Sequence, residues 1–130
     1  MFIDNLNLVV SEIGSETIVG HMPADSRHQQ TFGIVHGGVH ATLIQELALH
    51  AAQARFDRSS GGIARAIPLV NRTDFIRQHQ QGPLTIIGRL VDDLDDRQIW
   101  DFRITRDSDD ALVASGEVHV AASSDESPPA

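Results

Sequence analysis

The chain has 130 residues, no cysteine and a formal net charge of −8 at pH 7. A chain of this length buries a hydrophobic core as one domain without disulfides, and the lack of thiols excludes a cysteine nucleophile or metal ligand. The acidic balance argues against nonspecific nucleic-acid binding, which needs a basic surface that displaces counterions.

The amino-terminal segment MFIDNLNLVV is not typical of a secretory signal peptide, because it carries an acid and no basic cluster before its short apolar run. No apolar stretch approaches the roughly 20 residues that span a bilayer. We therefore expect a cytoplasmic protein whose partners include neither membrane nor nucleic acid.

The first half of the chain predicts two short strands and one helix. The strands are expected at Leu6–Ser11 and Glu16–His21, on either side of Gly14. The helix is expected at Val39–Phe56, where apolar and alanine residues recur on one broad face. The turn formers of Asp57–Gly62, DRSSGG, are predicted to end it.

The second half has the pattern of strands joined by hairpin turns. These strands are expected at Ala66–Arg77, Leu84–Val91, Gln98–Thr105 and Ala111–Ala121. Hairpin-linked strands with one early helix indicate an α+β domain, in which an antiparallel sheet packs on the helix. We assign residues 1–121 to this domain. Residues 122–130 are mostly small or acidic, with two prolines near the end, so we expect a disordered acidic tail.

The string FGIVHGGVHATLIQE, residues Phe32–Glu46, lies where the chain is predicted to enter the helix. In this string and in the order of its elements, the chain resembles the hotdog-fold acyl-CoA thioesterases. The most similar branch holds the phenylacetic-acid-pathway thioesterase and the Arthrobacter-type 4-hydroxybenzoyl-CoA thioesterase. The resemblance runs from about Leu6 to Ala121 and includes Asn71 in LVNRTDFIR, Gly82 before the next strand, and DALVASGEVHVA. It implies an antiparallel β-sheet wrapped around one long central helix, and a homodimer or homotetramer with composite active sites.

The resemblance also implies roles around the start of the helix. Gly37 would donate its N–H to the thioester carbonyl, since first-turn N–H groups lack intrahelical partners and lie at the positive end of the helix dipole. Gly38, which has no Cβ, would let the ligand approach the backbone. Gln30 and His36 match positions that orient the thioester or the water. The alternative for the glycine pair is a tight loop-to-helix turn that binds nothing.

The catalytic carboxylate of such relatives lies nine residues after the motif histidine, and that position holds Gln45 here. Glu46 comes one residue later, about 100° around the helix. An amide can orient a water, but it neither accepts a proton nor forms an acyl anhydride. A local shift could bring Glu46 into the site as nucleophile or base, with His50 one turn later holding its carboxylate.

Two further hypotheses stay open at this position. In one, Gln45 positions water and a histidine, His36 or His40, supplies the base. In the other, the protein binds an acyl-thioester without hydrolysing it. The polar residue that relatives place one turn after the carboxylate or in the following strand is Leu49 or Ile67 here, and both are apolar.

Coenzyme A is expected only as part of the substrate. Arg72 and Arg77 are the expected contacts for its phosphates, with Arg55, Arg58 and Arg65 nearby, because the planar guanidinium suits phosphate oxygens. For each arginine the alternative is a solvated surface charge. No HExxH motif occurs, and we expect no metal and no cofactor.

The preferred function is therefore hydrolysis of a small or aromatic acyl-CoA thioester. The leading alternative is a non-catalytic acyl-thioester-binding or interaction protein on the same fold, and a hydratase is a third possibility. The only tryptophan, Trp100, is expected to pack in the sheet or at a subunit interface.

Overall fold

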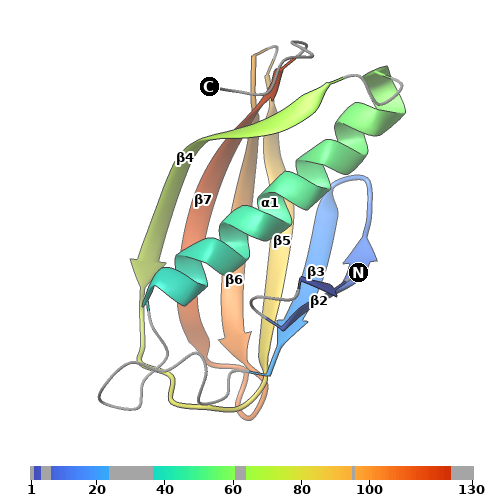
Figure 1. The fold of residues 1–130 in the computed structure, drawn as a ribbon. Coiled ribbons are helices and arrows are strands. Elements are labelled where there is room, and N and C mark those ends of the chain that lie inside the picture. Colours follow the sequence, from blue (N-terminus) through green and yellow to red (C-terminus); the bar gives the residue numbers. More distant parts are fainter. Residues whose placement is uncertain (1, 4–6, 24–36, 61–63, 95, 124–130) are drawn as a thin grey trace.

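The protein is described by a computed structural model that covers residues 2–3, 7–23, 37–60, 64–94 and 96–123. Within these ranges seven strands form one antiparallel sheet in the order β1-β2-β3-β5-β6-β7-β4. The strands are β1 Phe2–Ile3, β2 Leu8–Ile13, β3 Thr17–Met22, β4 Arg65–Phe75, β5 Leu84–Asp93, β6 Gln98–Arg106 and β7 Leu112–Ser123. The helix α1, Gly37–Ser60, lies diagonally across one face of this sheet (Figure 1).

The core forms between α1 and the sheet. The helix contributes Leu43, Ile44, Leu47 and Ala48, which are fully buried and recur with the helical period. A Cβ atom on Gly116 of β7 would lie 2.1 Å from Ile44 Cδ1 and 3.0 Å from the Arg72 carbonyl oxygen. A side chain at Gly116 would force Ile44 to move, so this glycine lets the helix pack directly on the sheet.

The helix ends one turn later than the sequence predicts. Asp57–Gly62 was expected to be a turn, but α1 continues to Ser60. Gln53 Nε2 donates to Asp57 Oδ1 over 2.9 Å, and Ser59 Oγ donates to the Phe56 carbonyl oxygen over 3.3 Å. These bonds engage the polar side chains of the last turns, so the turn formers remain helical and the predicted helix end is wrong.

The strands that the sequence predicts are confirmed, with shifts at their ends. β2 and β3 pair as the expected hairpin, and β5, β6 and β7 pair in chain order. β7 continues to Ser123, beyond the predicted boundary at Ala121, because Ala122 and Ser123 pair with Ala66 and Arg65 of β4. Residues 124–130 of the expected tail lie outside the described residues.

Trp100 is one of the core side chains and packs within the sheet, as one of the two sequence hypotheses held. Its exposed fraction is 0%, and its Nε1 donates to Gln98 Oε1 over 2.9 Å. A buried tryptophan N–H needs an acceptor, and Gln98, itself buried, supplies one. Trp100 is therefore fully accommodated inside one subunit.

β4 lies at one edge of the sheet and pairs only with β7 among the described strands. Four large apolar side chains in and just after this strand are exposed, namely Leu69, Val70, Phe75 and Ile76. An unpaired, apolar strand edge is a surface on which another strand can add.

The helix in the described ranges does not meet the requirements of a membrane-spanning segment.

Candidate active site

Among the described residues, none closes the amino-terminal end of α1 at Gly38. The helix begins with Gly37 and Gly38, and its first turn contains no acidic residue. A Cβ atom added to Gly38 would meet nothing within 4 Å. The first N–H groups of a helix have no intrahelical partner and lie at the positive end of its dipole. This turn can therefore donate hydrogen bonds to an acceptor that carries negative charge.

A polar network joins the middle of α1 to the edge strand β4. Asn71 Nδ2 donates to the Ala41 carbonyl oxygen over 2.9 Å and to Gln45 Oε1 over 3.2 Å. Thr73 Oγ1 donates to Asn71 Oδ1 over 2.8 Å. Gly38 and Gln45 are two helical turns apart, so they lie on the same side of α1. The network therefore occupies the flank of the helix that also carries Gly38.

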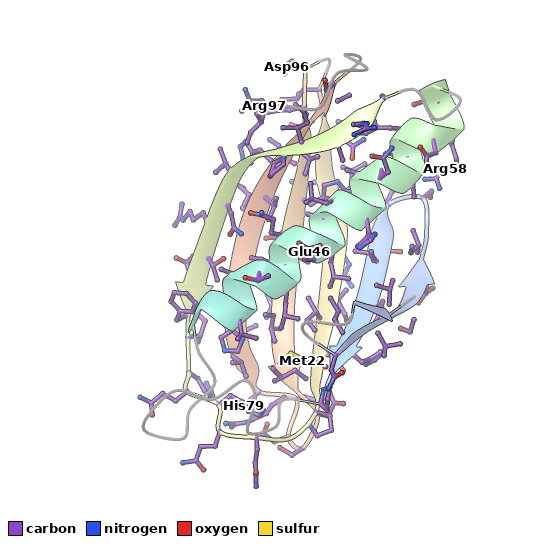
Figure 2. All side chains as sticks on the ribbon, in the orientation of Figure 1. Met22, Glu46, Arg58, His79, Asp96 and Arg97 are labelled. Atoms are coloured by element: carbon purple, nitrogen blue, oxygen red, sulfur yellow. The ribbon has the colours of Figure 1, made fainter. Side chains whose placement is uncertain are left out.

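Glu46 occupies a different side of the helix. It is half-buried, and it follows Gln45 by about 100° around the axis. Because Leu43 and Leu47 face the sheet, the period of the helix directs Glu46 away from the sheet. Figure 2 labels it midway along α1. His50, one turn later on the same edge, is also half-buried. The residue beside β4 is thus Gln45.

His40 lies inside the protein near the start of α1. Its exposed fraction is 4%, its Nδ1 has no hydrogen-bond partner, and its ring centroid is 6.4 Å from that of Phe75. Burial, with a smaller contribution from neighbouring His79, lowers the pKa of His40 to about 4. His79 belongs to the loop between β4 and β5, where its Nε2 donates to the Gly82 carbonyl oxygen over 2.9 Å (Figure 2). His40 is therefore a weak, enclosed base at neutral pH.

The two arginines expected to bind phosphates are exposed. Arg72 pairs across the strands with Glu117, on the face of the sheet opposite α1, and its Nη2 lies 3.8 Å from Asp74 Oδ2. Arg77 Nε donates to the Leu112 carbonyl oxygen over 3.2 Å. Side chains alternate along β4 and Asn71 takes the face toward the helix, so Arg72 lies on the other face. Arg77 comes after the end of β4, and its bond is to the Leu112 carbonyl oxygen rather than to Gln45.

Two expected site residues, Gln30 and His36, fall outside the described residues, so their roles stay predictions. Within the part of the chain that the structure describes, no group of three or more histidine, aspartate or glutamate side chains is placed to hold a metal ion.

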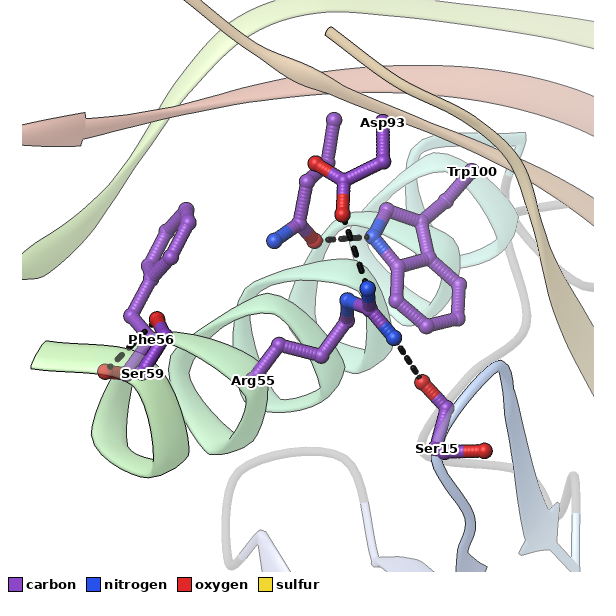
Figure 3. Close-up of polar contacts among 7 residues, drawn as sticks. Ser15, Arg55, Phe56, Ser59, Asp93 and Trp100 are labelled. Carbon is purple, nitrogen blue, oxygen red and sulfur yellow. Dashed lines mark hydrogen bonds and ion pairs between the residues drawn. The ribbon is translucent and has the colours of Figure 1, made fainter. Parts of the chain in front are cut away.

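The carboxyl-terminal end of α1 is tied to three neighbouring segments. Arg55 donates through Nη1 to the Ser15 carbonyl oxygen in the turn between β2 and β3, and through Nη2 to Asp93 Oδ2 over 2.7 Å (Figure 3). Gln53 Nε2 donates to the Ala64 carbonyl oxygen over 2.8 Å, and the Ala66 N–H donates to Gln53 Oε1 over 2.9 Å. A cavity of about 320 Å³ lies beside Arg55. The guanidinium at this end bonds to the protein itself.

Sequence reasoning noticed Asn71 only as part of the resemblance and missed its partner Thr73. The signal was available, because residues 71, 73 and 75 alternate with 72 and 74 along one strand and must share a face. The contact between Asn71 and Gln45 spans 26 residues, however, and the local pattern does not contain it.

Comparisons with known proteins agree with this fold. No family model matches the chain. The chain is 29% identical to Rv1847 of Mycobacterium tuberculosis, an esterase by name, over 119 residues that cover 92% of this chain and 84% of that protein. The solved structure of Rv1847 has a TM-score of 0.83 to this fold and covers 95% of each chain.

Two thioesterases with solved structures share the fold at lower identity. Thioesterase HI1161 of Haemophilus influenzae has a TM-score of 0.82 at 21% identity, with 92% of this chain and 80% of that chain covered. Thioesterase PA1618 of Pseudomonas aeruginosa has a TM-score of 0.83 at 24% identity, with 92% and 83% covered. The sheet with one helix thus matches the hotdog-fold thioesterases, and the names of the relatives support hydrolysis of esters or thioesters as the general activity.

Proposed function

We propose that this protein hydrolyses the thioester of a small or aromatic acyl-CoA to a free acid and coenzyme A, as in the branch that its sequence resembles. The observation that carries the proposal is the amino end of α1, where no described residue lies against Gly38, on the same flank as Gln45 and Asn71. The similarity to esterases and thioesterases supports the general class of reaction.

In this proposal the residues before the helix, the residues of α1 and two arginines each have a separate role. The Gly37 N–H polarises the thioester carbonyl and stabilises the oxyanion that forms when the carbon is attacked. Gln30 and His36 orient the thioester or the water. A local shift of the helix brings Glu46, which lies on another side of α1, to the thioester. There Glu46 either attacks the carbonyl carbon, so that the thiolate of coenzyme A leaves and water then hydrolyses the acyl anhydride, or takes a proton from a water that attacks the carbon and expels the thiolate. His50 holds the Glu46 carboxylate, and Arg72 and Arg77 bind the phosphates of coenzyme A.

The proposal includes a homodimer, alone or paired into a tetramer, in which the edges of β4 meet. The free edge of β4 and its exposed Leu69, Val70 and Phe75 support it, because an exposed apolar strand edge is otherwise prone to nonspecific association. In such a dimer the flank that holds Gln45 and Asn71 lies near the junction of the two copies, so each site borders the partner subunit.

The test is a spectrophotometric assay of free thiol over a panel of acyl-CoA thioesters. Glu46→Gln is expected to lower kcat by about 100-fold or more, because general base assistance typically contributes about 10²–10⁴ in rate. Glu12→Gln makes the same chemical change at an exposed position of β2 and serves as the matched control. Unchanged turnover in Glu46→Gln would show that another group supplies the attack.

A second candidate function is binding of an acyl-thioester without hydrolysis. Gln45 favours it, since the side chain that faces β4 is an amide that cannot take a proton. In this case the natural chain releases no thiol from any member of the panel, whereas Gln45→Glu gains activity. If both the natural chain and Gln45→Glu bind coenzyme A thioesters but hydrolyse none, the missing carboxylate at position 45 does not explain the lack of hydrolysis.

A further inference from the structure

We infer that Asn71 is a positioning residue that fixes the amide of Gln45 in one orientation, with the Gln45 NH₂ group directed away from β4 to bind the carbonyl oxygen of the ligand. This inference rests on the proposed function for the identity of the ligand. It assigns to Gln45 the part of a hydrogen-bond donor to the thioester, in place of the acid that relatives carry there.

The orientation of Asn71 follows from its contact with the helix. The main-chain oxygen of Ala41 can only accept a hydrogen bond, and it lies 2.9 Å from Asn71 Nδ2. The NH₂ end of Asn71 must therefore point toward α1. Thr73 then meets the other end of the amide, where its hydroxyl donates to Asn71 Oδ1 over 2.8 Å. If Asn71 turned around, its Oδ1 would face the Ala41 carbonyl oxygen and that bond would be lost, although the Thr73 hydroxyl could then accept instead of donate.

The orientation of Gln45 follows from that of Asn71. The second N–H of the Asn71 NH₂ group is directed at Gln45 over 3.2 Å, so the Gln45 atom that it meets must be the acceptor Oε1. The oxygen and nitrogen of a planar amide point in different directions from their shared carbon. With Oε1 facing Asn71, the Gln45 NH₂ group therefore points away from Asn71. Among the described residues no acceptor is found for it, and the side chain is only half-buried.

In this arrangement the flank of α1 presents hydrogen-bond donors rather than acceptors. The first-turn N–H groups are donors, and the outward NH₂ group of Gln45 is a further donor two turns along the same side. A hydrogen-bond donor beside an oxygen that gains negative charge stabilises it. Gln45 therefore suits the carbonyl oxygen of a thioester, and it offers nothing to a water that must lose a proton.

The test compares two ligands that cannot be hydrolysed. In one the sulfur of an acyl-CoA is replaced by a methylene group, so that a ketone keeps the carbonyl oxygen. In the other an alkyl thioether of coenzyme A lacks that oxygen. The preference for the ketone is the Kd of the thioether divided by the Kd of the ketone. When both are measured by calorimetry on one preparation, this ratio does not depend on the fraction of folded protein.

Removing the donor is expected to reduce the preference for the ketone. Gln45→Met, which keeps the length of the side chain, should lower the ratio by about three- to tenfold, the effect of one hydrogen bond. Gln45→Glu should lower it at least as much, since a carboxylate presents only acceptors to the carbonyl oxygen.

The decisive variant is Asn71→Asp, which is expected to reverse the orientation of the Gln45 amide without changing Gln45 itself. Asn71→Asp removes the NH₂ group, so Gln45 is expected to turn its own NH₂ toward the new carboxylate and present Oε1 to the ligand. The preference for the ketone should then fall about as much as in Gln45→Met, although Gln45 is intact. In the Gln45→Met background, Asn71→Asp should change the ratio no further. Gln78→Glu, an amide-to-acid change in an exposed loop, is the matched control.

The outcomes separate this inference from the proposed function. If the natural chain binds neither ligand, the acyl-CoA proposal is wrong and the inference falls with it. If both ligands bind but Gln45→Met or Asn71→Asp leaves the ratio unchanged, the inference is overturned while the proposed function stands. If both substitutions lower the ratio and are not additive, the role of Asn71 is established.

Discussion

The two ends of α1 use polar side chains in opposite ways. At the carboxyl end, Arg55 bonds to Ser15 and Asp93 through its two terminal nitrogens, and Gln53 bonds to groups that precede and begin β4. At the amino end, no described residue lies against Gly38, and within the same part of the chain the Gln45 amide is bonded on one side only. At the carboxyl end most of the polar atoms bond within the fold, although Arg55 Nε is buried without a partner, whereas at the amino end donors remain that no described residue uses.

This difference also separates stability from function. A substitution at the carboxyl end removes hydrogen bonds within the fold, so it should lower the free energy of unfolding. A substitution at Gln45 or Asn71 removes donors that are aimed at least partly outward, so it should change ligand binding more than stability. The following predictions test this separation, from the largest effect to the smallest.

The largest expected effect comes from His40, a buried side chain near the start of α1 whose Nδ1 has no hydrogen-bond partner. The folded pKa of about 4 lies below the ordinary value of 6.5, so the unfolded chain binds more protons between these values. Stability is therefore fully present above about pH 6.5 and falls as the pH drops toward about 4, by roughly 3 kcal/mol. Urea unfolding measured across this range checks the loss.

His40→Leu should remove this part of the pH dependence, since leucine has no proton to bind. His21→Leu, at an exposed position of β3, is the matched control. If His40→Leu and the natural chain lose equal stability on acidification, the histidine is not held neutral by the fold.

Gln53→Met tests the carboxyl end of α1. The change keeps the length of the side chain but removes three hydrogen bonds, to Asp57, Ala64 and Ala66, and leaves the Ala66 N–H without this acceptor. We expect a loss of about 2 kcal/mol in the free energy of unfolding, with kcat unchanged for the folded fraction. Gln78→Met, in an exposed loop, controls for the added sulfur. A drop in kcat without a drop in stability would reverse the proposed division between the two ends.

Arg55→Met should have the smallest effect. The ion pair between Arg55 and Asp93 is partly solvated, with side-chain exposures of 24% and 47%, so we expect about 1 kcal/mol from it and the bond to Ser15 together. Chemical denaturation at low and high salt separates the two terms, because only the ion pair is screened. Asp93→Asn retains a hydrogen-bond acceptor and should lose less. Equal losses in both variants would show that the charge of the pair, rather than the bond to Ser15, carries the effect.

Most of the fold follows from patterns within single segments. Strand alternation and the helical period of Val39–Phe56 predict the order of the elements, because burial repeats every two or every 3.6 residues. The end of the helix could not be predicted in this way. The turn formers DRSS stay helical because Gln53 binds Asp57. The helix propensities of the single residues do not include such a bond between two side chains.

The site was less predictable than the fold, because its contacts join distant segments. Arg55 was expected near the phosphates of coenzyme A or in solvent, yet its guanidinium bonds to residues 40 and 38 positions away. The position of Gln45 nine residues after His36 follows from counting alone, but its partner on β4 does not. Only the three-dimensional structure shows that the amide replacing the usual acid is held by a second amide.

The close approach at Gly116 limits where the substrate range of such a protein can evolve. Ile44 fills the space above this glycine, so the seam between helix and sheet is shut at that point and no acyl chain can lodge there. Under the proposed function, the acyl group therefore lies outside this contact. Replacements that change the preferred acyl group are expected elsewhere than at Ile44 and Gly116.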